Sequence, residues 1–176
     1  MLKKGLIQIY TGRGKGKTTA AMGLALRAVE GDLKVCYVSF HKNCGGYNCG
    51  GAAMLKKIGI SVYGFAEESI CDGKNFNKDE IRNDCLKGLE AIKSIFKENK
   101  YDVLILDEII ISVREGFLKE NEVLDLMESK PASLELVMTG RDASENIIKK
   151  ADLVSEIKKI KHPYDTGKKA RRGIEY

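Results

Sequence analysis

Residues 5–30, GLIQIYTGRGKGKTTAAMGLALRAVE, decide the fold. They predict a short apolar strand over residues 5–10, a glycine-rich turn, and a helix over residues 18–30. A glycine-rich turn between a strand and a helix is the structural context of a phosphate-binding loop, whose usual sequence motif is G-x-x-x-x-G-K-[ST]. Here Thr11 stands where the first glycine is expected, and Gly12 follows one residue late. The sequence therefore predicts a phosphate site built on a shortened loop.

Residues of this loop carry the chemistry that a nucleotide needs. Glycines leave backbone N–H groups free, and together with the positive end of the helix these groups attract phosphate oxygens. Lys17 adds a mobile ammonium, and the Thr18 hydroxyl is a ligand for Mg2+. The alternative is a glycine turn with incidental lysines. This alternative is disfavoured because the Gly-Lys-Thr run lies where the helix begins. The candidate nucleotide-binding residues are Gly12, Arg13, Gly14, Lys15, Gly16, Lys17, Thr18 and Thr19.

Strands and helices alternate along the rest of the chain. Asn77, with Glu80 three places later, forms a predicted capping box, and an apolar stripe from Ile81 to Phe96 then follows a helical period. Asp142 with Glu145 predicts the cap of another short helix. We expect a single α/β domain over residues 1–176, similar to P-loop NTPases, with a mostly parallel sheet flanked by helices and ligands beyond the carboxyl ends of its strands. Further strands are predicted at residues 34–40, 60–65, 101–107 and 134–139, and further helices at residues 54–58 and 119–129.

The buried run VLILDE ends in two carboxylates, Asp107 and Glu108. At the carboxyl end of a strand they are expected to face the Mg2+ held by Thr18. Either carboxylate is a candidate to hold the metal, directly or through water. Glu108 is alternatively a residue that prepares an attacking water, as in an ATPase, and a surface acidic pair is the structural alternative. The candidate catalytic residues are Lys17 and Glu108, and the candidate metal ligands are Thr18, Asp107 and Glu108.

Two arginines and two histidines complete the candidates. Arg141 follows another predicted strand, so its guanidinium is expected on the same rim. Arg27 lies ten residues after Lys17 on the first helix, where it points either toward phosphate or along the surface. His41 and His162 stand in no Ser–His–Asp or Cys–His arrangement, so we expect structural roles or substrate contacts for them.

Composition is that of an ordinary single module. The chain is 43% hydrophobic and 31% charged, and it lacks both a secretory leader pattern and an apolar run long enough for a membrane span. We therefore expect a cytoplasmic protein with no membrane or nucleic-acid partner. The net charge of +5 is concentrated in residues 158–172, which form either a solvated tail or a phosphate-facing one.

Five cysteines in such a chain are expected to be thiols. Cys44 and Cys49, in the glycine-rich stretch NCGGYNCGG, form a candidate metal pair. Their four-residue separation differs from the C-x2-C spacing of zinc sites. The remaining cysteines are Cys36, Cys71 and Cys85.

Four blocks of the chain carry a family resemblance: residues 10–28, the VLILDE run at 103–108, VMTGR at 137–141, and above all the tail ADLVSEIKKIKHPYDTGKKARRGIEY at 151–176. Because these four blocks occur in this order, and because the loop has this pattern, the chain resembles the ATP:corrinoid adenosyltransferases of cobalamin biosynthesis and salvage. The glycine one place late is the family's own variant of the loop. The tail is much more specific than any phosphate loop.

The resemblance implies a reaction other than phosphoryl transfer. A corrinoid reduced to monovalent cobalt would attack the 5′ carbon of ATP, and triphosphate would leave. The nucleotide would lie reversed in the loop, with Lys17 and Mg2+ stabilising the leaving triphosphate, and no general base would be needed. The resemblance also implies a cellular reductant for cobalt and a homodimer. The alternatives are a P-loop ATPase or kinase and a non-catalytic module that senses ATP or corrinoid.

The sequence departs from the family where the corrinoid would bind. Family members carry an aromatic segment after the third strand that covers the lower face of the corrin, and Phe65 fits this segment. The expected tryptophan is absent, because the chain contains none. Residues 43–52 are rich in glycine and cysteine, where the family carries a more conventional loop.

Overall fold

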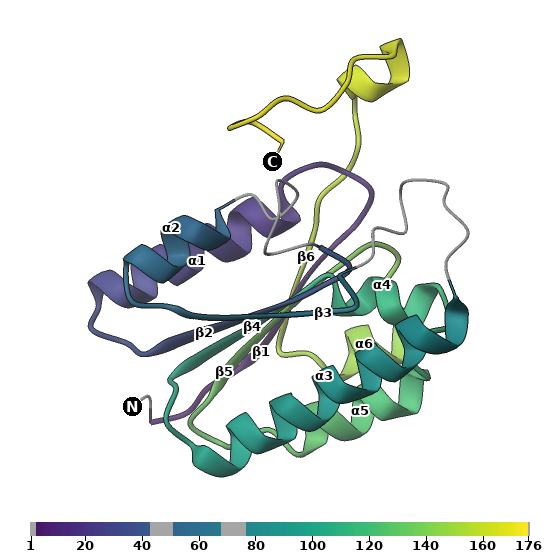
Figure 1. Ribbon diagram of the computed structural model, residues 1–176. Helices are drawn as coiled ribbons and strands as arrows, with labels where there is room; N and C mark the ends of the chain where they lie inside the picture. Colours follow the sequence, from purple (N-terminus) through teal and green to yellow (C-terminus); the bar gives the residue numbers. More distant parts are fainter. Residues whose placement is uncertain (1–2, 43–50, 68–76, 176) are drawn as a thin grey trace.

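The computed structural model describes residues 3–42, 51–67 and 77–175 (Figure 1). Within them, a six-stranded sheet has the order β3-β2-β4-β5-β1-β6, and every neighbouring pair is parallel. The prediction of an α/β fold with a mostly parallel sheet is confirmed. The strands are β1 (Ile7–Thr11), β2 (Val35–Phe40), β3 (Ser61–Phe65), β4 (Val103–Asp107), β5 (Glu135–Thr139) and β6 (Leu153–Glu156).

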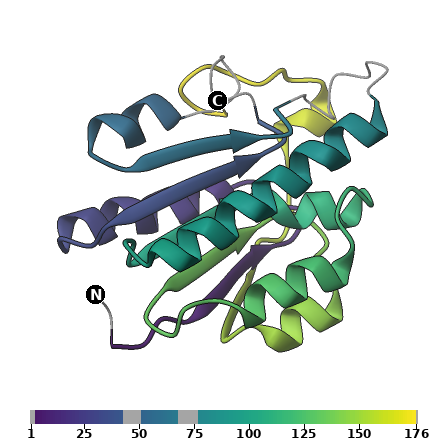
Figure 2. The same cartoon turned by 60° about the horizontal axis from the view of Figure 1, so that its bottom comes forward.

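Helices cover both faces of the sheet. α1 and α2 lie on one face, while α3, α4, α5 and α6 lie on the other (Figure 2). β2 and β4 are buried at every residue, which explains their continuous apolar sequence. The helices are α1 (Lys17–Glu30), α2 (Ala52–Lys57), α3 (Lys78–Glu98), α4 (Ile109–Arg114), α5 (Glu120–Glu128) and α6 (Glu145–Lys150), and a 3-10 turn, η2, spans Pro163–Thr166. No helix in the described ranges is long and apolar enough to cross a membrane.

Helix α3 follows its predicted pattern. The Asn77 side chain accepts a hydrogen bond from the backbone N–H of Asp79 at 3.1 Å, so Asn77 is the N-cap as predicted. Glu80 accepts from the Asn77 side-chain amide at 3.0 Å, and not from its backbone N–H as in the predicted capping box. The apolar stripe faces the core: Ile81, Cys85, Leu89, Ile92 and Phe96 are all buried. The cap residue therefore predicted the start of this helix, and amphipathic periodicity predicted its inner face.

Two local features differ from the sequence expectation. Asp142 does not cap α6, because the cap is Ser144, whose side chain accepts from the N–H of Ile147. Asp142 instead has a φ of 56° and its carboxylate lies 3.3 Å from Arg13 and 3.7 Å from Arg114. Helix α4 was not predicted, since its isoleucine run after a strand has no helical signal of its own. It begins because Glu108, with a φ of 67°, turns the chain at the end of β4.

Strand order determines what meets at the carboxyl edge of the sheet. β5 lies between β1 and β4, so roughly 10 Å, two strand spacings, separates the ends of these two strands. Helix α1 starts after the loop that follows β1 and packs against β4 and β5, which brings its first turn over this gap. The chain after β6 continues above the same edge, as the yellow segment of Figure 1.

Candidate active site

The glycines of the loop allow another segment to approach its backbone directly. A Cβ added at Gly12 or Gly14 would lie 2.6 or 2.7 Å from the carbonyl oxygen of Ile157. Two hydrogen bonds join the segments: the N–H of Gly14 donates to Ile157 at 2.6 Å, and the N–H of Ile157 donates to Thr11 at 2.9 Å. Thr11 is the last residue of β1, and Gly12 follows it with a φ of 96°. The packing of the chain after β6 on this loop therefore requires glycine at positions 12 and 14.

Lys17 lies inside the curve of the loop. Its ammonium donates to the carbonyl oxygens of Gly12 and Gly14, at 2.8 and 2.7 Å, and the residue is only 6% exposed. Burial lowers the pKa of Lys17, and the nearby Arg141 adds to this effect, whereas the Glu108 carboxylate opposes it. The loop thus already organises a buried positive charge at its centre.

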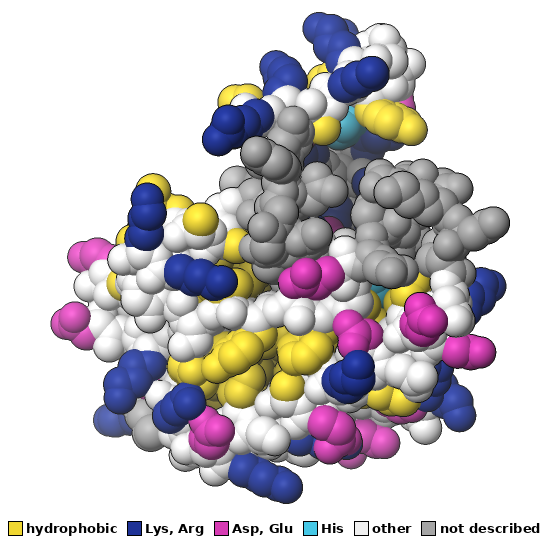
Figure 3. Space-filling model, in the orientation of Figure 1, with side chains coloured by type: hydrophobic (Ala, Val, Ile, Leu, Met, Phe, Trp, Pro, Cys, Tyr) yellow, Lys and Arg dark blue, Asp and Glu magenta, His cyan; other side chains and the backbone are white. Residues whose placement is uncertain are grey.

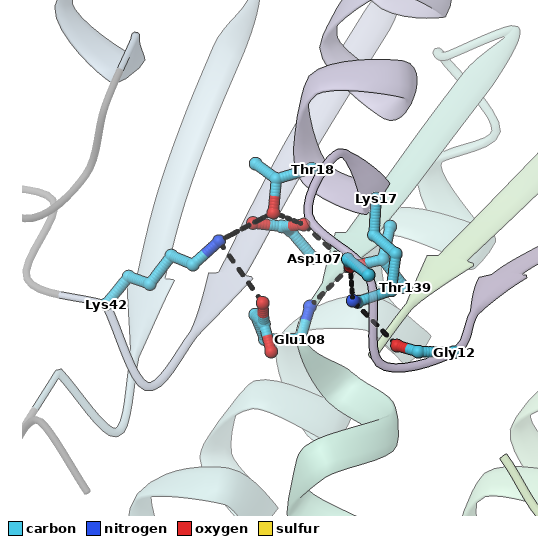
Figure 4. Close-up of polar contacts among 8 residues, drawn as sticks. Gly12, Lys17, Thr18, Lys42, Asp107, Glu108 and Thr139 are labelled. Atoms are coloured by element: carbon cyan, nitrogen blue, oxygen red, sulfur yellow. Dashed lines mark hydrogen bonds and ion pairs between the residues drawn. The ribbon is translucent and has the colours of Figure 1, made fainter. Parts of the chain in front are cut away.

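Asp107 is the centre of the polar network (Figure 4). Its buried carboxylate accepts from the hydroxyls of Thr18, at 2.9 Å, and Thr139, at 2.7 Å. The ammonium of Lys42 donates to its other oxygen at 2.6 Å. Burial alone would raise the pKa of Asp107, but the Lys42 ammonium and the hydrogen bonds outweigh it and lower the pKa. Asp107 is therefore held as a carboxylate.

Glu108 has a different environment. Its backbone N–H donates to Thr139 at 3.0 Å, and one carboxylate oxygen lies 3.5 Å from the Lys42 nitrogen. The other oxygen, Oε2, is buried and has no hydrogen-bond partner among the described residues. Burial raises the pKa of Glu108; Lys42 opposes this rise, and the Asp107 charge adds to it. Glu108 lines the neighbouring cavity, and Oε2 is its carboxylate oxygen without a partner among the described residues.

A cavity of about 1150 Å³ opens beside these residues. One wall comes from the loop and α1, and another comes from the segment after β6, including Lys159, His162 and Tyr164. Lys15 of the loop pairs with Glu175 of this segment at 3.2 Å. Figure 3 shows Lys and Arg side chains gathered on the same segment above the sheet. The basic tail is therefore partly solvated and partly a wall of the cavity.

The structure brings most of the predicted residues together. Asp107 and Gly12 lie behind the cavity wall and contact its lining through the hydrogen bonds given above. The predicted residues that line the cavity are Arg13, Gly14, Lys15, Gly16, Lys17, Thr18, Thr19, Glu108 and Arg141.

Arg27 and Phe65 lie elsewhere. Arg27 is exposed in the last turn of α1, roughly 15 Å along the helix from Lys17. Phe65 ends β3, and its ring packs on Phe40 with 6.1 Å between centroids. Cys44 and Cys49 lie outside the described residues. Within the described ranges, no group of three or more His, Cys, Asp or Glu side chains is arranged to hold a metal.

Sequence reasoning missed two polar residues of the network. Thr139 was quoted only within the VMTGR block at 137–141, and Lys42 was not singled out. A usable signal existed for both, since each lies at or just beyond the carboxyl end of a predicted strand. The sequence pattern does not show that the ends of β2, β4 and β5 are adjacent.

His41 has the structural role expected of it. Its ring nitrogen Nε2 lies 2.7 Å from the Ser112 hydroxyl, and the ring packs on Phe117 with 5.5 Å between centroids. Burial lowers the pKa of His41 from 6.5 to about 4. The other ring nitrogen is buried and has no hydrogen-bond partner among the described residues, so a proton on it would be poorly solvated.

This environment predicts a loss of stability in mild acid. Below pH 6.5 the unfolded chain takes up a proton on His41, while the folded chain does so only near pH 4, so acid favours unfolding. Between pH 7 and pH 5 the contribution lost should be about 2 kcal/mol. The measurement is the free energy of unfolding by urea at both pH values for the wild type and for His41→Gln. An equal decrease in both proteins would contradict this assignment.

Comparison with known proteins identifies the family to which the chain belongs. Residues 3–176 match the family described as ATP:corrinoid adenosyltransferase BtuR/CobO/CobP. The chain belongs to this family. It is 34% identical over 174 residues to the corrinoid adenosyltransferase of Escherichia coli K12, a match covering 99% of this chain and 87% of that protein. It is 33% identical over 174 residues, with the same coverage, to the corrinoid adenosyltransferase CobA of Salmonella typhimurium LT2.

The expected function is therefore confirmed: the chain is an ATP-dependent corrinoid adenosyltransferase, which transfers the adenosyl group of ATP to cobalt. Its fold is also shared more widely. The KaiC-like protein PH0186 from Pyrococcus horikoshii OT3 superposes with a TM-score of 0.56 at 18% identity, over 89% of this chain and 74% of that one. At this identity the likeness concerns the fold alone.

Proposed function

We propose that this adenosyltransferase holds the triphosphate of ATP in the loop of residues 12–19, under the wall formed by the segment after β6. The main support is the cavity beside the loop, which is lined by Lys15, Lys17 and Arg141. The first turn of α1 directs backbone N–H groups and its positive end toward the same space.

A divalent cation fits the oxygens at the base of this cavity. Thr18 and Asp107 are already joined by a hydrogen bond, and Glu108 adds an unpartnered oxygen. Hydroxyl and carboxylate oxygens are the ligands that Mg2+ prefers. We assign Thr18, Asp107 and Glu108 as the residues that would hold Mg2+, directly or through water. Bound there, Mg2+ would neutralise part of the triphosphate charge.

The chain's own cations would act on the leaving group. In the transfer reaction, the electron pair of monovalent cobalt forms the bond to the 5′ carbon, and the carbon–oxygen bond breaks with its electron pair going to triphosphate. Negative charge therefore increases on the triphosphate in the transition state, beside Lys17 and Arg141. Groups that bind this charge more strongly in the transition state than in the ground state accelerate the step. Because cobalt is the nucleophile, Glu108 is not required as a base.

The remaining assignments concern partners. We propose that the corrinoid binds near the carboxyl ends of the strands, with Phe65 at the end of β3 on its lower face. A cellular reductant would supply monovalent cobalt, and the enzyme would act as a cytoplasmic homodimer. Arg27 would contribute to nucleotide binding only if some other part of the assembly brought ATP to the far end of α1.

One assay tests the reaction against its alternatives. The protein is incubated with MgATP and chemically reduced cobalamin in the dark, and the products are separated. A light-sensitive adenosylcorrinoid and triphosphate in equal amounts are expected. ADP without adenosylcorrinoid would indicate an ATPase or kinase, and binding of both substrates without any product would indicate a sensing module.

A further inference from the structure

Lys42 places a positive charge among the three residues assigned to Mg2+. Its ammonium lies 2.8 Å from the Thr18 hydroxyl, 2.6 Å from Asp107 and 3.5 Å from the nearer oxygen of Glu108 (Figure 4). The side chain enters from the end of β2, across the network from the loop, and is 22% exposed. Lys42 also lines the cavity, so its ammonium lies at the boundary between the buried carboxylates and the space for ATP.

An ammonium and a divalent cation compete for these oxygens. Mg2+ needs its ligands at about 2.0–2.1 Å and in octahedral directions. The Lys42 nitrogen already lies within hydrogen-bond distance of two of the three groups. Like charges at such short range repel strongly in a partly buried site. The presence of either cation among these oxygens therefore weakens binding of the other.

We propose that Lys42 is the site's resident counter-cation, which exchanges its place among Thr18, Asp107 and Glu108 with the divalent metal that accompanies ATP. This inference rests on the proposed function, because it takes these three residues as the metal ligands. Once displaced, the ammonium remains in the cavity and pairs with phosphate oxygens. The buried carboxylates then have a cation beside them at every stage, and the triphosphate gains one more positive group.

The backbone that precedes Lys42 suits a movement of the side chain alone. The preceding residue, His41, has a φ of 58°, and its N–H donates to the Phe65 carbonyl at 3.2 Å. Its ring is fixed against Ser112 and Phe117. Lys42 therefore follows an anchored residue, and its four-carbon stem has the rotatable bonds through which the ammonium can turn toward the cavity that Lys42 lines.

The alternative is a permanent structural ion pair. Asp107 already accepts from two hydroxyls, of Thr18 and Thr139, so its carboxylate is oriented without Lys42. A purely structural pair also gives no reason for the ammonium to lie on the cavity side. The two interpretations make opposite predictions for metal binding in the absence of nucleotide, because only a competitor increases metal affinity when it is removed.

Binding of Mn2+ alone, measured by electron paramagnetic resonance, separates them. In Lys42→Met the dissociation constant for Mn2+ should fall by about tenfold or more, because the competing charge is gone. Lys42→Arg, which keeps the charge, should bind Mn2+ as weakly as the wild type. Lys42→Gln serves as a second neutral variant if Lys42→Met does not fold, as judged by circular dichroism.

Lys159→Met is the matched control. Lys159 lines the same cavity, but its ammonium pairs with Asp165 at 2.9 Å, away from the metal ligands. Its loss should change the Mn2+ dissociation constant by less than about twofold. Unchanged or weaker Mn2+ binding in the neutral Lys42 variants, or equal tightening in Lys159→Met, would overturn the proposal.

A second titration separates this proposal from the assignment of the metal site. Wild-type protein is titrated with Mn2+ in the presence of ATP, beside Thr18→Val. If ATP does not promote Mn2+ binding, or if Thr18→Val binds it equally well, the metal assignment itself is wrong. If both behave as expected and Lys42→Met still shows no tightening, only the exchange at Lys42 is refuted.

Discussion

Lys17→Ala is expected to lower turnover at saturating ATP by on the order of a hundredfold or more. The Lys17 ammonium is held inside the loop by the carbonyls of Gly12 and Gly14, at 2.8 and 2.7 Å. Its position is thus fixed before the reaction, and it requires little reorganisation when charge increases on the triphosphate. The rate of adenosylcorrinoid formation in a single turnover measures the transfer step directly, with ATP and reduced cobalamin at concentrations above their dissociation constants.

Two controls show whether this decrease is a transition-state effect. Loss of the two carbonyl contacts would also loosen the loop, so the thermal unfolding of Lys17→Ala is measured beside its rate. Lys15→Ala removes a neighbouring lysine that is exposed and pairs with Glu175. Its main effect should be on the KM for ATP and not on turnover at saturating ATP. A Lys17→Ala rate equal to that of the wild type at saturating ATP would exclude the proposed role.

Local sequence predicted those parts of the fold whose signals are contiguous. The loop and its flanking strand and helix are specified within residues 5–30, and the amphipathic stripe of α3 is read from its own period. The pair Asp107 and Glu108 was predicted as one unit, but their separate environments were not. Glu108 turns the chain with a φ of 67°, and this conformation separates its side chain from that of Asp107.

Sequence could not predict which strand ends would be neighbours. The insertion of β5 between β1 and β4 brings Thr139 against Asp107, and the pairing of β2 with β4 does the same for Lys42. Tertiary pairing of this kind leaves no trace in local periodicity. The same reason explains the tail, whose residues form a wall of the cavity because the segment after β6 hydrogen-bonds to Gly14. The sequence of the tail indicated a family, but it did not indicate where the tail lies in the fold.

The exposed position of Arg27 follows from helical geometry. Its distance along the sequence from Lys17 is short, yet a helix rises about 1.5 Å per residue, so ten residues carry it to the far end of α1. Helical geometry alone, applied to the sequence, favours the surface position, one of the two that the sequence left open. Arg141 is far from Lys17 in sequence and nevertheless lines the same cavity, because β5 and β1 are paired.

Asp107→Asn should be among the most damaging conservative changes in the chain. The amide has nearly the same volume as the carboxylate, so packing is preserved, but the two hydroxyls and one ammonium that now donate to Asp107 would meet an NH2 group at one of its positions. The change also removes the negative charge that Lys42 and, in its place, a divalent cation would neutralise. We expect the affinity for Mn2+ in the presence of ATP to fall by about a hundredfold, with a similar loss of turnover.

Thr139→Val is the matched control for this prediction. It removes one hydrogen bond to Asp107 and the acceptor for the Glu108 N–H, while leaving every charge in place. If orientation of the carboxylate were its main contribution, the two variants would lose similar amounts of Mn2+ affinity. If charge dominates, as a fully buried carboxylate beside Lys42 indicates, Thr139→Val should lose about tenfold or less. An Asp107→Asn protein that binds Mn2+ with ATP as the wild type does would place the metal elsewhere, and Glu108 with Thr18 would then be the pair to test.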